Sequence, residues 1–231
     1  MSNLNECILE IKYKPIPQII DCRGLWAELI SKQMNLSEWS ITDNRIDIFD
    51  IQNKERAFIG FQNAGFVIND SPSEKYFSDK TANLIKCLFS QKEFEENLSI
   101  YRLGVRLKVC REYKGSFEEL KQKYISKYIS YGDEINKIYD NSEPSYIFTS
   151  INFRSHSNNY NTRSAPMTNA HLINFFDRKI ILPKVGLYFD IDNWIRPKSD
   201  INESQIIKEI AGFIQLNWKK FEAVTDLILK K

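Results

Sequence analysis

Side chains able to bind anions or metal ions recur at alternate positions in three segments of the chain. In "YRLGVRLKV" (101–109) cationic and apolar residues alternate, which predicts a strand whose cations share one face. "TSINFRSH" (149–156) and "GLYFDIDNW" (186–194) repeat the alternation. If the three strands belong to one sheet, their polar side chains line one surface, formed by Arg102, Arg106, Lys108, Asn152, Arg154, His156, Asp190 and Asp192.

This predicted surface has three chemical interpretations. It can be an ordinary polar sheet face, in which cross-strand Arg–Asp pairs contribute roughly 0.2–1 kcal/mol each. It can be a concave binding site, because the planar guanidinium group suits phosphate and carboxylate groups. Asp190 and Asp192 can also hold a divalent cation such as Mg²⁺, since hard ions prefer carboxylate oxygen. The sequence leaves these interpretations open.

Motifs for catalysis or cofactor binding are missing from the sequence. The two histidines, His156 and His171, lack a convincing metal-ligand spacing, and no Ser-His-Asp arrangement, Walker motif or Rossmann fingerprint occurs. The four cysteines, Cys7, Cys22, Cys87 and Cys110, lack the paired spacing of a structural zinc site. We therefore predict no catalytic residue, no metal and no cofactor.

The composition is that of a folded protein with little overall charge. Hydrophobic residues make up 42% of the 231 residues and aromatic residues 13%, which excludes a disordered chain. With 32 basic and 30 acidic residues, the formal charge of +2 creates no global field for non-specific nucleic-acid binding. The sequence has neither a secretory leader nor an apolar run near 18 residues. We expect a cytoplasmic protein with reduced thiols and no membrane association.

The predicted elements follow the same order in two halves, roughly 1–97 and 98–231: strand, helix, several strands, long helix. The first half has strands at 7–14, 45–52, 56–62 and 65–70. It also has a helix at about 21–34, where Asp21 is the candidate N-cap, and a second helix that follows "SPSE". The second half has strands at 100–111, 145–155 and 184–194, helices at about 116–131 and 202–229, and a polar loop at 155–170.

This order predicts an α+β fold. Two such halves can pair edge to edge into one curved, mainly antiparallel sheet with helices on one face. Because no Gly- or Pro-rich linker lies near residue 97, we expect a single pseudo-symmetric domain over residues 1–231. The duplication is inferred from element order, since the halves share no residue-level identity.

Three short motifs resemble those of a sporadically distributed prokaryotic protein family of unknown function. The family has an R-x-G-x-R pattern on a central strand, matched by Arg102, Gly104 and Arg106, and a late D-I-D strand, matched by Asp190 and Asp192. Its last helix carries Phe and Thr-Asp, matched by Phe221, Thr225 and Asp226. The chain departs from the family at 155–170. The resemblance implies a prokaryotic cytosolic protein and supplies no reaction.

From these observations we expect a non-enzymatic binding module whose polar sheet face recognises a protein partner or a second copy of the chain. One alternative is RNA binding through the basic strand and the 155–170 segment, which contains Tyr160 and Arg163 among Asn and Ser. Another is a metal-dependent enzyme that acts on an anionic or nucleotide-like ligand.

Overall fold

A computed structural model describes residues 3–129, 137–139, 142, 144–155, 158–176, 181–197 and 201–230. Within these residues nine strands form one open antiparallel sheet. The strands are β1 (Asn3–Tyr13), β2 (Glu38–Ile41), β3 (Arg45–Asp50), β4 (Glu55–Gly60), β5 (Asn63–Asn69), β6 (Ile100–Glu112), β7 (Thr149–Arg154), β8 (Asn159–Thr168) and β9 (Val185–Ile195).

The described residues also form helical segments. They are α1 (Gln18–Asp21), α2 (Arg23–Met34), α3 (Glu74–Phe89), α4 (Lys92–Asn97), α5 (Phe117–Tyr124) with a π-helical turn (Ile125–Ile129), α7 (Asn169–Leu172) and α8 (Glu203–Leu229). The predicted α+β class with a mainly antiparallel sheet is therefore confirmed.

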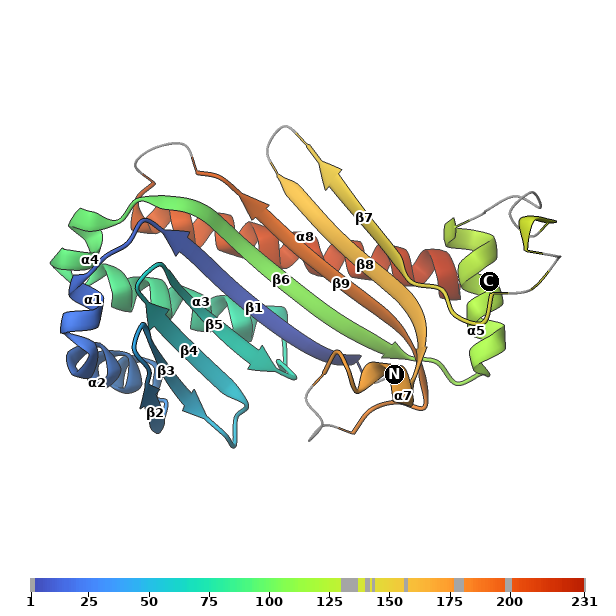
Figure 1. Cartoon of the computed structure of the whole chain (residues 1–231), viewed down its shortest axis with the longest axis horizontal. Coiled ribbons are helices and arrows are strands. Elements are labelled where there is room, and N and C mark those ends of the chain that lie inside the picture. Colours follow the sequence, from blue (N-terminus) through green and yellow to red (C-terminus); the bar gives the residue numbers. More distant parts are fainter. Residues whose placement is uncertain are drawn as a thin grey trace.

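The two long strands β1 and β6 pair at the centre of the sheet (Figure 1). Outward from β1 lie β5, β4, β3 and β2, and outward from β6 lie β9, β8 and β7. Each half of the sequence thus builds one side of the sheet. Strands far apart in the chain become neighbours where the halves meet.

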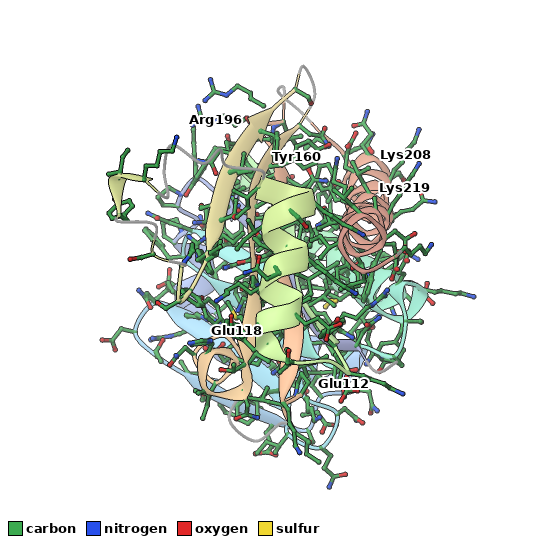
Figure 2. The ribbon with its side chains drawn as sticks, turned by 90° about the vertical axis from the view of Figure 1, so that its right-hand side faces the viewer. Glu112, Glu118, Tyr160, Arg196, Lys208 and Lys219 are labelled. Carbon is green, nitrogen blue, oxygen red and sulfur yellow. The ribbon has the colours of Figure 1, made fainter. Side chains whose placement is uncertain are left out.

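The longer helices pack on one face of the sheet, with α3 and α8 crossing behind the central strands in Figure 1. In Figure 2 α8 is seen nearly end-on beside the strands, and Lys208 and Lys219 extend from it away from the sheet. The core lies in this layer, where each fully buried large apolar side chain contributes about 1.5–3 kcal/mol. Its central members include Leu9, Ile11, Phe66, Leu103, Val105, Leu107, Phe189, Ile191, Leu84, Ile210 and Phe213.

Among the described residues, the opposite face is covered at one end by α7 and residues 173–176. Leu172 and Phe176 pack there on a small cluster that includes Cys110 and Tyr188. Because Cys110 and Tyr188 have the same parity as Arg106 and Asp190, this cluster belongs to the face that carries the predicted polar surface. We call the uncovered remainder of that face the open face.

Side-chain caps define the starts of three helices. Ser73 accepts a hydrogen bond from the Tyr76 amide at the start of α3, and Ser116 accepts one from the Glu119 amide at the start of α5. Asn202 and Gln205 form a reciprocal capping box at α8, which confirms the helix predicted at 202–229.

Several predicted elements differ from the structure. Asp21 ends α1 and is no N-cap; Cys22 occupies the cap position of α2, without a side-chain hydrogen bond. The strand β4 begins one residue before its predicted range of 56–62. The strand β2 and the helix α4 were missed, because segments of four and six residues are too short to show a clear period. The strand predicted at 145–155 spans only β7.

The main error concerns residues 155–170, which the sequence predicts as a loop. Most of them form β8, which pairs with both β7 and β9. Its helix-side positions include Thr162 and Ser164, which are buried although polar, and Ser164 contacts the Tyr124 hydroxyl. The apolar alternation that marks a strand is therefore missing from β8.

Among the described residues no helix is both long and apolar enough to cross a membrane.

Candidate functional site

The predicted face assignments are correct for the described residues. Alternate burial along β6 places Arg102, Arg106 and Lys108 opposite the core, and the register puts Arg106 beside Asp192 and Lys108 beside Asp190. Asn152 and Arg154 of β7 point to the same open face, through a register that runs across β8 to β9. The prediction for His156 lies outside the described residues.

Arg102 joins two acids from neighbouring strands. Its Nη2 donates to both carboxylate oxygens of Asp192, at 2.8 and 2.7 Å, and its Nη1 donates to Oε2 of Glu10 at 3.0 Å. The guanidinium carbon also lies 5.5 Å from the ring centroid of Trp194, within cation–π range. Arg102 therefore connects β1, β6 and β9.

Arg106 forms a bidentate pair with Asp190, with Nε–Oδ1 and Nη2–Oδ2 distances of 2.8 and 2.7 Å. The Asp190 side chain is only 3% exposed, whereas that of Arg106 is 36% exposed. Hydrogen bonding to Asp190 raises the pKa of Arg106 above its ordinary value. The Tyr188 hydroxyl also donates to Asp190, at 3.2 Å, and its pKa is raised by burial and by the carboxylate charge.

Lys108 completes the pattern by donating to Oε1 of Glu6 at 2.6 Å. All three cations that β6 places on the open face thus have carboxylate partners within the chain. The arrangement corresponds to the first interpretation of the sequence, a network of cross-strand ion pairs. An anionic ligand at these positions would have to displace a carboxylate that is already held by the fold.

Gly104 makes the network geometrically feasible. A Cβ at this position would lie 2.9 Å from the Cβ of Trp194 and 3.4 Å from Nη1 of Arg102. The Arg102 side chain therefore uses the space above Gly104 to reach along the sheet. This accounts physically for a glycine between the two arginines in the R-x-G-x-R pattern.

Beside this network the open face is hollowed by a depression of about 640 Å³. Its first wall is the ion-paired surface of β6 and β9. Its floor and second wall come from the first half of the chain and combine apolar with charged side chains. The apolar lining residues are Ile8, Phe49, Ile51, Phe58 and Val67.

One cross-strand row runs through the hollow. The register places Phe49 of β3 beside Arg56 of β4, then Val67 of β5, Ile8 of β1 and Arg106 of β6. Neighbouring strands are about 4.8 Å apart, so the apolar pair Val67 and Ile8 separates the two arginines by roughly 14 Å. The hollow therefore presents an apolar strip between two cationic side chains.

Asn152 and Arg154 lie away from this hollow. They line a separate recess with Asn159, Asn161 and Trp194 near the hairpin of β7 and β8. Asn161 contacts Asp192 at 3.3 Å, which links the recess to the ion-pair network. Of the predicted residues, Arg102, Arg106 and Asp192 line the hollow and Asn152 and Arg154 line the recess, while Lys108 and Asp190 line neither.

The lining from the first half was missed at the level of sequence. The signal was present, because residues 45–50 and 55–60 also alternate, with Phe49, Arg56 and Phe58 on the parity opposite the core. The sequence does not show that β4 and β5 lie next to β1 in the sheet, so it cannot place their side chains in one hollow with those of β6.

The acid pair is engaged by arginines. Asp190 and Asp192 each accept two hydrogen bonds from a guanidinium group, and the described residues contain no group of three or more His, Cys, Asp or Glu side chains arranged to hold a metal ion. A cation at either aspartate would have to compete with an arginine.

No protein-family model matches the chain, and a search of curated proteins finds no match.

Proposed function

We propose that the protein is a non-enzymatic binding module that recognises a protein partner through the open face. The hollow carries this proposal: an apolar strip lies beside rigid ion pairs on a face that the long helices leave uncovered. Protein interfaces combine such features, with aromatic and arginine side chains around a desolvated centre.

The saturation of the cations favours a protein partner over a small anion. Arg102, Arg106 and Lys108 each have a carboxylate within 3.0 Å. Their fixed positions give the surface a rigid shape, and rigid surfaces lose little conformational entropy on binding. The same pairing makes the alternative of an enzyme with Mg²⁺ at Asp190 and Asp192 less favourable.

RNA binding through β8 has weaker support than a protein partner. Tyr160 lies on the helix side of the sheet, where Nζ of Lys220 is 4.6 Å from its ring centroid. Arg163 lies on the open face, beside Asp190 in the register. The aromatic and cationic groups therefore occupy opposite faces and form no common stacking surface.

Two exposed apolar residues allow a matched test. Ile51 lines the hollow and is 61% exposed, while Leu25 of α2 is 60% exposed on the other side of the molecule. Neither side chain contributes much to the core, so Ile51→Arg and Leu25→Arg should both fold. We expect tagged wild-type protein and Leu25→Arg, isolated from the native cells at low salt, to retain one stoichiometric protein companion that Ile51→Arg loses.

Mass spectrometry of the eluates and their absorbance ratio at 260 and 280 nm measure the outcome. A companion retained equally by Ile51→Arg would show that the hollow is not the binding surface. Co-purifying nucleic acid that salt removes would favour RNA binding instead, because counterion release makes such binding salt-dependent.

We also infer that the two halves arose by duplication. From the centre outward, β1, β5, β4 and β3 correspond to β6, β9, β8 and β7, and α2 and α3 take the places in chain order of α5 and α8. A matching strand order on both sides of a central antiparallel pair supports this inference.

Our proposal extends to family and location. Arg102 and Arg106 contact Asp192 and Asp190, so the two motifs behind the resemblance to the sporadic prokaryotic family are partners in space. Cys7, Cys87 and Cys110 are buried free thiols. The spatial pairing supports the resemblance to this prokaryotic family, and the buried free thiols support a reducing cytoplasm. Self-association through the open face is the alternative to a different protein partner.

A further inference from the structure

The cations on the two sides of the hollow are held very differently. On the β6 side, cation–carboxylate distances are 2.6–3.0 Å. On the β4 side, Lys54 lies 3.7 Å from Asp70, and Arg56 lies 3.8 Å from Asp47. Among the described cations that line the hollow, Lys54 and Arg56 therefore have the longest distances to a carboxylate.

Arg56 is the less satisfied of the two. Asp47 accepts hydrogen bonds at Oδ1 from both Nε and Nη2 of Arg45, and the contact of Arg56 is to this same oxygen. The Arg56 side chain is 49% exposed, and its guanidinium makes no hydrogen bond to any residue that the structure describes. One carboxylate therefore serves two guanidinium groups.

Other acids near this wall are engaged elsewhere. Asp50 accepts hydrogen bonds from the Gln52 and Asn53 amides and the Asn53 side chain, and these bonds lower its pKa. Glu55 faces the helices, where it binds Tyr76 and Lys80. Neither carboxylate pairs with Arg56, whose carboxylate contact among the described residues is the one it shares with Arg45 at Asp47.

Arg56 stands directly beside the apolar strip. Val67 is its register partner on β5, and Ile8 is the partner of Val67 on β1. The backbone of Val67 therefore lies about 4.8 Å from that of Arg56, and the backbone of Ile8 lies one strand spacing farther away. Extended chains advance about 3.3 Å per residue, so an anchor above Val67 or Ile8 is about two or three residues from a group that reaches Arg56.

We propose that the partner presents a bulky apolar side chain to Val67 and Ile8 and, within about three residues, a carboxylate to Arg56, with Lys54 nearby. This assignment rests on the proposed protein-binding function and specifies the chemistry of its partner. The ion pairs of β6 and β9 form a rigid wall, and Arg56 selects the acidic group.

A random linear peptide library displayed on phage and selected on the immobilised full-length protein tests the assignment. We expect the enriched peptides to combine Leu, Ile, Met or an aromatic residue with Asp or Glu within about three positions. Replacing that acid by its amide in a synthetic peptide should weaken binding about tenfold, and Arg56→Glu should weaken it at least as much.

Lys219→Glu provides the matched control, since it makes the same charge change on the exposed side of α8. It should leave peptide affinity unchanged, as measured by fluorescence polarisation. When Arg56→Glu binds the amide peptide, the loss of binding free energy should be smaller than the sum of the two single losses, because each change removes the same contact.

Four results would overturn the assignment: no enriched peptide, enriched peptides without an acid, equal affinity of Arg56→Glu for them, or an oligouridylate RNA that binds the wild type and not Arg56→Glu. If the native companion is lost by Ile51→Arg and kept by Arg56→Glu, the open face remains the binding surface and only the acidic chemistry is wrong. If both variants keep it, the proposed function fails as well.

Discussion

Arg106 and Asp190 form the ion pair of the open face whose disruption should cost the most stability. Asp190 is almost fully buried, so Arg106→Met leaves a carboxylate inside the protein without its guanidinium. We expect a loss of about 3 kcal/mol in the free energy of unfolding, measured by urea denaturation. Arg102→Met should cost about 1 kcal/mol, because Asp192 is more exposed and can be hydrated.

The double variant Arg106→Met/Asp190→Leu separates pairing from packing. It should recover part of the loss, since apolar residues can replace a buried pair without leaving a charge behind. If the double variant is less stable than Arg106→Met, the cost lies in packing and not in the unpaired carboxylate.

Gly104 should tolerate no side chain. In Gly104→Ala the new Cβ meets Trp194 and the Arg102 guanidinium, and we expect a loss of about 1–3 kcal/mol in the free energy of unfolding. Gly212→Ala is the control, because nothing lies within 4 Å of its added Cβ in the middle of α8. That change should raise stability by about 0.5–1 kcal/mol. Thermal unfolding of both variants measures the contrast.

At the level of elements, Tyr124 attaches α5 to the outer hairpin of the sheet. Its hydroxyl donates to Thr149 of β7 at 2.8 Å and contacts Ser164 of β8 at 2.7 Å. We expect Tyr124→Phe to lower the free energy of unfolding by about 1 kcal/mol and to accelerate amide hydrogen exchange in β7. Edge strands depend on such contacts because only one side of the strand is paired.

Tyr128→Phe tests whether the hydrogen bonds cause this effect. The Tyr128 ring centroid lies 5.1 Å from that of Tyr124, and its hydroxyl makes no hydrogen bond within the described residues. Exchange in β7 should therefore stay unchanged in Tyr128→Phe. Equal acceleration in both variants would assign the effect to ring packing.

For the whole molecule, buried cysteine thiols and tyrosine hydroxyls that stay protonated in the folded state predict a loss of stability at alkaline pH. Burial raises the pKa of Cys87 to about 11 and those of Cys110 and Tyr124 to about 12; it also raises the pKa values of Tyr13 and Tyr188. In the unfolded chain these groups ionise near pH 8.5 for thiols and pH 10 for tyrosines. Their full contribution to stability is therefore present below about pH 8.5 and is lost as pH rises through the folded-state values.

Urea unfolding at a series of pH values should show stability falling above about pH 8.5 and more steeply above about pH 10. As pH rises, the buried tyrosines should stay protonated in the native protein. Their contribution to the absorbance change of tyrosine ionisation should therefore appear only when the protein unfolds. Tyr188→Phe should flatten the upper part of the curve, since it removes one proton released on unfolding. Constant stability up to about pH 11 would contradict the buried, protonated state of these groups.

The sequence by itself determined the orientation of side chains along the predicted strands of the polar surface and the starts of several helices. Alternation assigns Arg102, Arg106, Asp190 and Asp192 to a face because successive side chains point to opposite sides of any strand. Capping residues such as Asn202 act on amides three positions away. Both signals are local, so they can be read without knowing the tertiary structure. They also supported the α+β class.

Only the tertiary structure decided which strands became neighbours and so which side chains meet. Arg106 and Asp190 are 84 positions apart, and their contact depends on β9 pairing with β6. The pairing of β8 depends on contacts from Tyr124, since β8 itself lacks apolar alternation. The hollow needs β4, β5 and β1 beside β6. Strand order is a property of long-range packing, because every strand offers the same backbone hydrogen-bonding groups to any neighbour.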